Sequence, residues 1–255
     1  MTSLGGRTLV IGVDRLDYSK GITNRIVAFE RVLQMEPGWA RRIALMQIAV
    51  PSRGRIEAYG ALKKEVEATI GEINGRHADV DWAPIRYLNK SFAQATLAGF
   101  YRLARVGLVT PLHDGMNLVA KEYVAAQDAG DPGVLILSEF AGAAKELDTA
   151  LLVNPHDMEG MAQSIFKALV MSADERRERW QSMYTKLKSK PVQGWFTDFV
   201  TTLRQVSHAT PRRVAATVTI LPAPYNRASR GSSALSYHRE TAAAPEFAAP
   251  TTSTL

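Results

Sequence analysis

Residues 7–21 read RTLVIGVDRLDYSKG, an apolar run that passes directly into a polar loop. Residues 7–13 are rich in β-branched side chains and are bounded by glycines, which is typical of a buried strand. Residues 22–35 then carry apolar side chains at helical spacing, and a Pro-Gly pair at 37–38 stops the helix. A buried strand, a loop and a helix in this order predict the first unit of an alternating β/α fold.

The alternation of strand-like and helix-like patterns continues to about residue 205. Further strand candidates fall at residues 43–50, 85–88, 106–110, 133–138 and 150–153. Further helix candidates fall at residues 57–73, 92–104, 119–129, 158–171, 174–187 and 195–203. Strands separated by helices imply a mostly parallel sheet covered on both faces, which is a doubly wound, Rossmann-like α/β domain. Such domains bind ligands at the carboxyl ends of their strands, so the loops after strands should carry the chemistry.

The composition changes from about residue 206 onward, where alanine, proline, threonine and serine dominate and apolar periodicity disappears. No pattern in this segment buries enough apolar surface to offset the entropy of ordering it. The sequence therefore predicts one domain over residues 1–205 and a disordered tail over residues 206–255.

Composition excludes several classes of protein. The chain of 255 residues has no cysteine, which rules out disulfides, thiolate metal sites and a cysteine nucleophile, and fits a reducing cytoplasm. Its five histidines are scattered without ligand spacing, so we expect no metal site and no bound cofactor. The first residues do not resemble a signal peptide, and no apolar run approaches the length of a membrane span. We therefore expect a soluble, cytoplasmic protein with no membrane partner.

The net charge of +6 raises the question of nucleic-acid binding. Much of this charge lies in the tail, where only Glu240 and Glu246 offset the five arginines Arg212, Arg213, Arg227, Arg230 and Arg239. The rest of the chain shows no basic stripe interleaved with aromatic residues. Nucleic acid is therefore not an expected partner.

The first motif with chemical potential is the loop after the first strand, residues 15–21. It places Arg15 and Lys20 five residues apart on a loop that opens a helix. Loop amides, a helix N-terminus and two cations together suit a diphosphate. The alternative is a solvated turn in which Arg15 and Lys20 pair with Asp14 or Asp17. Neither a GxGxxG nor a Walker loop accompanies the motif, which disfavours dinucleotide and P-loop chemistry.

The second motif is HDGMNLVAKE at residues 113–122, which follows the strand candidate at 106–110. Gly115 favours a tight turn and the next helix should begin near Asn117, so backbone amides of 115–119 would point above the sheet. Asp114 lies in the loop and Glu122 lies in the helix, a separation that lets one bind a sugar while the other reaches a ribose. The alternative is a capped helix with ordinary acidic residues.

Other signals are weaker. Arg53 follows a strand end at the carboxyl edge of the predicted sheet, although it is equally consistent with an ordinary surface arginine. Phe92 opens a helix, where it could be a core residue or a ligand contact. The small-residue turn at 140–144 suits close approach by a ligand, or equally close packing of a helix. Ser19 and Ser138 lack the nucleophile elbow of a serine hydrolase.

Taken in order, five segments of this chain closely resemble the trehalose-6-phosphate synthase family over roughly residues 7–205. That family consists of retaining glycosyltransferases with two Rossmann-like domains that face each other across a cleft. The segments are VDRLDYSKGI at 13–22, PSRG at 51–54, YLNKSF at 87–92, VGLVTPLHDGMNLVAKEYVAAQ at 106–127 and LSEFAGAAKEL at 137–147.

The resemblance implies UDP-glucose as donor and glucose 6-phosphate as acceptor. By position, Arg15 and Lys20 resemble the diphosphate-binding pair, and Asp114 resembles the carboxylate that holds the donor glucose hydroxyls. These three are the expected catalytic residues. Glu122 resembles the ribose-binding acid, and Arg53 resembles the arginine that binds the acceptor phosphate. The remaining expected donor contacts are Phe92, Gly115, Met116, Asn117, Leu118 and Val119.

The resemblance also implies a second domain. Family members carry an N-terminal domain with most of the acceptor site, whereas the first strand of this chain begins at residue 7. We therefore expect the C-terminal, donor-binding half of a truncated or split synthase, partnered by a separate N-terminal half or by another copy. Its last helix, near residues 195–203, should expose an apolar face. The alternatives are a non-catalytic UDP-sugar-binding or partner-docking module, and a related two-domain transferase with another acceptor, of the sucrose or glycogen type.

Overall fold

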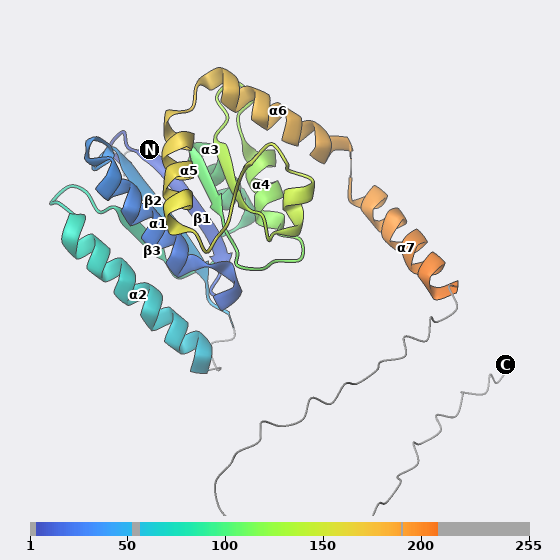
Figure 1. Cartoon of the computed structure of the whole chain (residues 1–255), viewed down its shortest axis with the longest axis horizontal. Helices are drawn as coiled ribbons and strands as arrows, with labels where there is room; N and C mark the ends of the chain where they lie inside the picture. Colours follow the sequence, from blue (N-terminus) through green and yellow to red (C-terminus); the bar gives the residue numbers. More distant parts are fainter. Residues whose placement is uncertain (1–3, 53–56, 190, 209–255) are drawn as a thin grey trace, which may run out of the picture. The chain divides into compact units, whose positions relative to one another are not determined.

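The computed structural model describes residues 4–52, 57–189 and 191–208 (Figure 1). Arg53 and nearly all of the predicted tail lie outside these residues. Where the tail was expected to begin, the last helix continues to His208, so residues 206–208 are helical.

The core of the described chain is a six-stranded sheet in the order β3-β2-β1-β4-β5-β6, with every neighbouring pair parallel. Its strands are β1 (Thr8–Arg15), β2 (Ile43–Val50), β3 (Ile85–Leu88), β4 (Val106–Val109), β5 (Val134–Ser138) and β6 (Leu151–Val153). The order is that of a doubly wound, Rossmann-like sheet, which confirms the predicted fold class.

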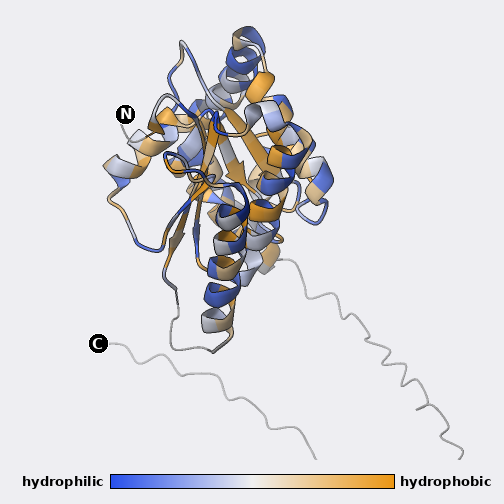
Figure 2. Cartoon of the chain, turned by 90° about the vertical axis from the view of Figure 1, so that its left-hand side faces the viewer, coloured by the Kyte–Doolittle hydropathy of each residue, from blue (hydrophilic) through white to orange (hydrophobic). Residues whose placement is uncertain are grey.

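Helices cover both faces of this sheet (Figure 1). The helices of the described residues are α1 (Ile22–Met35), α2 (Glu57–His77), α3 (Gln94–Leu103), α4 (Leu118–Ala126), α5 (Met158–Val170), α6 (Ala173–Ser189) and α7 (Val192–His208), and α1 to α6 are those that pack against the sheet. Buried side chains of α1, α2 and α5 form one apolar cluster with the sheet, and those of α3, α4 and α6 form a second cluster on the opposite face. Figure 2 shows the apolar strands between these helices, whose outer surfaces are more polar.

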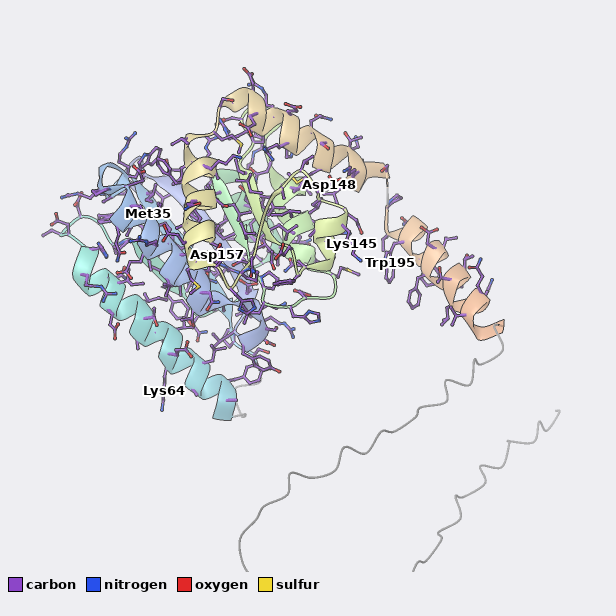
Figure 3. All side chains as sticks on the ribbon, in the orientation of Figure 1. Met35, Lys64, Lys145, Asp148, Asp157 and Trp195 are labelled. Carbon is purple, nitrogen blue, oxygen red and sulfur yellow. The ribbon has the colours of Figure 1, made fainter. Side chains whose placement is uncertain are left out.

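Helix starts follow the usual capping chemistry. Asp157 lies at the start of α5 (Figure 3), where its carboxylate accepts a hydrogen bond from the Gly160 amide at 2.9 Å. Asn117 caps α4 in the same way through the Ala120 amide at 3.1 Å. Within the described residues, no helix is long and apolar enough to cross a membrane.

The first strand is longer than its sequence pattern indicates. β1 continues to Arg15 because Asp14 and Arg15 pair in parallel register with Ala49 and Val50 of β2. This extension places the Asp14 carboxyl at the carboxyl end of the sheet.

The strand order places the switch point of the sheet between the neighbouring strands β1 and β4. The chain leaves β1 for helices on one face and leaves β4 for α4 on the other face, so the loops after these two strands face each other. This is the position at which doubly wound sheets form their binding crevice.

Candidate functional site

The loop after β1 is held by local hydrogen bonds. Asp17 caps the 3-10 helix η2 (Tyr18–Lys20), with its Oδ1 accepting from the Ser19 amide at 3.0 Å and from the Ser19 hydroxyl at 2.9 Å. Gly21 follows with a φ of +61°, and a β-carbon there would lie 2.7 Å from the Thr110 carbonyl oxygen. Only glycine therefore suits this position, where the loop passes close to the end of β4.

The surroundings of Asp17 also lower the pKa of its carboxyl. Burial opposes ionisation of its carboxyl, but the Ser19 hydrogen bonds, the Tyr59 hydroxyl and the nearby Arg15 charge outweigh that effect and lower its pKa. The pKa in the folded protein thus lies below the ordinary value of 3.8.

A lowered pKa in the folded state means that ionised Asp17 stabilises the fold above the unfolded-state pKa, and that this contribution is lost as pH falls through the folded-state pKa. We therefore expect Asp17→Asn to reduce the free energy of unfolding at pH 7, with a deficit that shrinks as the pH falls below 3.8. Urea unfolding of both proteins across this range measures the deficit. A deficit that does not change with pH would contradict the assignment.

The loop after β4 is organised around Asp114 and Asn117. Asn117 has a φ of +70°, a conformation that asparagine tolerates better than most residues. Its amide nitrogen donates to Asp114 Oδ2 at 3.1 Å, while its side-chain oxygen caps α4. The cap therefore fixes the Asp114 carboxylate relative to the helix N-terminus.

The small-residue turn at 140–144 supports this loop from the outside. The Gly142 amide donates to the Asp114 carbonyl at 2.9 Å, and the Ala143 amide donates to the Met116 carbonyl at 2.8 Å. A β-carbon on Gly142 would lie only 2.0 Å from the Gly115 carbonyl oxygen. The small residues thus allow close packing against residues 114–116.

The two loops meet in one cavity of about 360 Å³. Lys20 Nζ lies 2.6 Å from Asp114 Oδ2, across 94 residues of sequence. Lys20 therefore pairs with Asp114, and not with Asp14 or Asp17 as in the alternative interpretation of the loop. Arg15 is exposed, and its guanidinium makes no hydrogen bond or ion pair with the described residues. The cavity is lined by Asp14, Arg15, Lys20, Asp114, Met116, Asn117, Leu118 and Val119.

This arrangement can bind an anion and a polyol together. Arg15 and Lys20 supply positive charge, and Leu118 and Val119 at the start of α4 line the cavity, where the helix dipole favours negative charge. Asp114 supplies a carboxylate that can accept hydrogen bonds from hydroxyl groups. Within the described residues no three histidine, aspartate or glutamate side chains gather as metal ligands.

Glu122 and Phe92 lie farther along, towards α3. Glu122 is on the exposed side of α4, one turn beyond Leu118, with Oε2 3.5 Å from the Tyr101 hydroxyl. It lines a second cavity of about 220 Å³ between α3 and α4. Burial and the Glu122 charge raise the pKa of Tyr101, which keeps its hydroxyl protonated. Phe92 packs edge-on against Phe100 with ring centroids 5.4 Å apart.

The structure thus brings most, but not all, of the expected site residues together. Seven of them line the cavity of Lys20 and Asp114, and Gly115 lies in its wall loop between Asp114 and Met116. Glu122 and Phe92 lie outside that cavity, and Arg53 is outside the described residues.

Sequence reasoning missed the roles of Asp14 and Arg25. Asp14 lines the cavity and is paired with Arg25, whose side chain is fully buried on α1. The signal was present, because Arg25 stands three residues after Ile22 and four before Phe29, in the middle of the apolar stripe. A charged residue there requires a buried partner.

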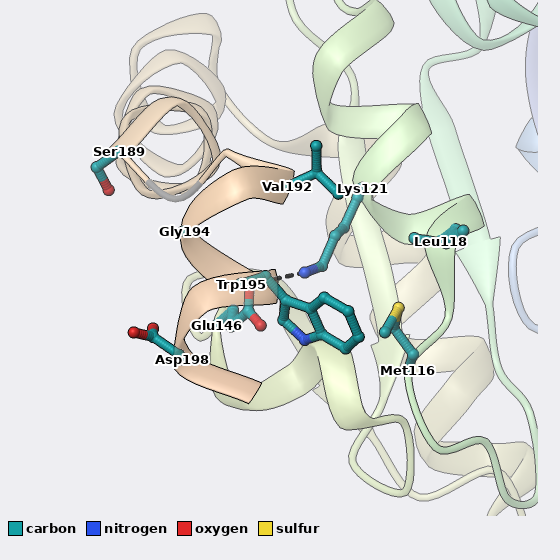
Figure 4. Close-up of a pocket in the computed structure, with 9 residues that line it drawn as sticks. All are labelled: Met116, Leu118, Lys121, Glu146, Ser189, Val192, Gly194, Trp195 and Asp198. Carbon is teal, nitrogen blue, oxygen red and sulfur yellow. Dashed lines mark hydrogen bonds and ion pairs between the residues drawn. The ribbon is translucent and has the colours of Figure 1, made fainter. Parts of the chain in front are cut away.

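A third cavity, of about 520 Å³, adjoins α7 (Figure 4). It shares Met116 and Leu118 with the Lys20 cavity and contains the Lys121–Glu146 ion pair at 2.8 Å. Trp195 of α7 points into it. As expected for the last helix, α7 exposes apolar side chains, namely Val192, Trp195, Phe196, Phe199, Leu203 and Val206.

Comparison with known proteins identifies the family. The profile of glycosyltransferase family 20 matches residues 2–205. The chain belongs to glycosyltransferase family 20. This confirms the resemblance inferred from the motifs.

Individual relatives agree with this assignment. A trehalose-6-phosphate synthase from Sinorhizobium fredii is 53% identical over 201 residues, which are 79% of this chain and 43% of that protein. The chain therefore spans less than half the length of the curated relatives that it matches.

Solved structures give the same result. A UDP-forming trehalose-phosphate synthase from Burkholderia xenovorans, in complex with glucose-6-phosphate, superposes with a TM-score of 0.78 at 48% identity, covering 80% of this chain and 45% of that chain. An E. coli structure with bound UDP-2-fluoro glucose superposes with a TM-score of 0.77 at 44% identity, covering 80% and 45%.

Proposed function

We propose that this chain supplies the donor-binding half of a trehalose-6-phosphate synthase, which transfers glucose from UDP-glucose to glucose 6-phosphate with retention. The observation that carries the proposal is the single cavity in which Arg15, Lys20, Asp114 and the N-terminus of α4 meet. The ligands in the B. xenovorans and E. coli structures, a glucose 6-phosphate and a UDP-glucose analogue, support the same pair of substrates.

In this proposal, Arg15, Lys20 and the first amides of α4 bind the diphosphate of the donor. Breaking the bond between the anomeric carbon and the phosphate oxygen leaves negative charge on UDP. Cations fixed in place before the reaction stabilise that charge, an effect worth several kcal/mol of barrier. Lys20 is paired with Asp114. In this proposal, its ammonium turns to the phosphate when the donor binds, and Asp114 binds the sugar hydroxyls.

The proposed outer contacts of the donor are Glu122 on α4 and Phe92 just before α3. Glu122 lies one turn beyond the cavity, where its carboxylate reaches the ribose, and Phe92 lies on the α3 side as a nucleotide contact. Arg53 is proposed to bind the acceptor phosphate. The proposal includes a cytoplasmic location, and an N-terminal half or a second copy of the chain as partner.

We expect Asp114→Asn to reduce the preference of the chain for UDP-glucose over UDP by about 10- to 100-fold, because a charged hydrogen bond to the sugar is worth about 1.5–3 kcal/mol. Binding of UDP itself should persist, because in this variant the Lys20 ammonium is no longer paired with the Asp114 carboxylate and can bind phosphate. Calorimetric titration with each ligand measures the ratio of the two Kd values.

Asp148→Asn is the matched control, because Asp148 also pairs with a lysine, Lys186, away from the cavity. An unchanged preference in Asp114→Asn, or an equal loss in the control, would contradict the role given to Asp114.

Catalysis is separated from binding alone by an assay of UDP release. The chain is incubated with UDP-glucose and glucose 6-phosphate, with and without the N-terminal half of the S. fredii relative. Release that requires both the added half and glucose 6-phosphate supports the synthase. UDP-glucose binding without any release would indicate a non-catalytic module, and release with an unphosphorylated acceptor would indicate a different transferase.

A further inference from the structure

A buried arginine lies beneath the proposed donor cavity. Arg25 is fully buried in the first turn of α1, directly after the loop that carries Lys20. Arginine is rarely buried to this extent without partners. Its guanidinium pairs with the Asp14 carboxylate at 2.5 Å, and Asp14 in turn lines the cavity. The ion pair therefore forms part of the cavity floor.

The same guanidinium contacts four separate elements. Besides Asp14 on β1, it donates to Gln47 Oε1 on β2 at 3.2 Å and to Thr110 Oγ1 after β4 at 3.0 Å. It also donates to the Lys20 carbonyl oxygen at 3.4 Å. These contacts join the loop of Lys20 to the end of the strand that leads to Asp114.

The sequence of β1 makes room for this group. Gly12 is buried in β1, and a β-carbon there would lie 2.5 Å from Arg25 Nη1 and 2.5 Å from Gln47 Oε1. Gly12 thus leaves the space that the guanidinium occupies. The two loops also meet through their backbones, with the Leu112 amide donating to the Ser19 carbonyl at 2.7 Å.

A contribution to folding stability does not by itself explain why the Arg25–Asp14 ion pair is buried here. The desolvation penalty of two buried charges offsets much of their electrostatic attraction. Well-packed apolar residues can therefore often replace a buried ion pair without a loss of folding stability. Coupling between the charges offers a better reason, because Asp14 also interacts electrostatically with Lys20 and Asp114, the two ends of the ion pair in the cavity.

We propose that Arg25 is a positioning residue, which holds the Lys20 loop and the end of β4 in the register that binds the donor diphosphate. This inference rests on the proposed function, since it assigns Arg25 to the same site. Arg25 touches no substrate itself and acts through Lys20 and through the strand end at Thr110.

The test is calorimetric titration of the full chain with UDP. Arg25→Lys keeps a positive charge near Asp14 but cannot reach all four partners, so we expect UDP to bind about tenfold more weakly. The double variant Asp14→Asn/Arg25→Gln removes both charges together and should show the same loss. The Kd for UDP is compared with that of the native chain only for a variant that circular dichroism shows to be folded at the titration temperature.

A double-mutant cycle separates positioning from a merely structural role. If Arg25 acts through Lys20, the loss of UDP affinity caused by Lys20→Ala should be smaller in the Arg25→Lys background than in the native chain. Arg176→Lys is the matched control, because Arg176 is also buried and pairs with Asp131. It should alter the melting temperature and leave the Kd for UDP unchanged.

Each outcome has one meaning. Weaker binding in the Arg25 variants with a non-additive cycle supports the proposal. A native chain that binds UDP, together with Arg25 variants that bind it equally well or a cycle that is additive, overturns the positioning role and leaves the proposed function standing. A native chain that does not bind UDP overturns both.

Discussion

Replacing Lys20 with alanine is expected to weaken UDP binding by about 10- to 100-fold, as the loss of one charge-assisted hydrogen bond predicts. The ammonium lies in the cavity, 2.6 Å from Asp114, and is half of the cationic pair that the diphosphate would meet. Arg15→Ala should weaken binding in the same direction. Calorimetric titration of UDP into each variant measures these losses.

Lys186→Ala is the control for this prediction. Lys186 forms an ion pair with Asp148, as Lys20 does with Asp114, but it lines none of the cavities described above. Its removal should leave the Kd for UDP unchanged. Equal binding by the native chain and Lys20→Ala would rule out Lys20 as a phosphate contact.

Gly142→Ala should damage both stability and binding. The new β-carbon would lie 2.0 Å from the Gly115 carbonyl oxygen, and backbone rather than a flexible side chain would have to move. Overpacking of this kind costs about 1–3 kcal/mol of unfolding free energy. The displaced residues are those that carry Asp114, so the affinity for UDP-glucose should fall together with the stability. Urea unfolding and calorimetry measure the two effects.

Gly99→Ala provides the comparison. Gly99 lies within α3, and a β-carbon there would meet no atom within 4 Å. Alanine is the better helix former, so the stability should be unchanged or raised, and binding should not change. Gly142→Ala with native stability and native affinity would show that the 140–144 turn does not support the loop.

Periodicity predicted the fold well because long buried strands and amphipathic helices leave strong local patterns. The bounds of β2 and β3 coincide with the predicted residues 43–50 and 85–88. The end of β1 was missed because Asp14 and Arg15 are polar and join the sheet only through pairing with β2. The bounds of α7, Val192 and His208, were also missed. Val192 and Val206 continue the apolar spacing of the predicted helix, but the change in composition at about residue 206 was interpreted as the start of the tail.

The sequence predicted the motifs of the site but not the contacts between them. Each motif was visible from its composition, but the contact between Lys20 and Asp114 depends on β1 lying next to β4. No local pattern encodes that neighbourhood. The partners of Arg25 come from β1, β2, the residue that follows β4 and the loop of Lys20, so its role could be found only in three dimensions.

We propose that the cavity between the β1 and β4 loops binds a sugar nucleotide. Amide nitrogen–proton NMR spectra of the ¹⁵N-labelled chain, recorded during titration with UDP-glucose, test it most directly. We expect the largest shifts to fall on the amides of residues 15–21 and 115–119, and we expect Lys20→Ala to reduce them. Saturating UDP-glucose that shifts only amides elsewhere, such as those around the α7 cavity, would contradict it.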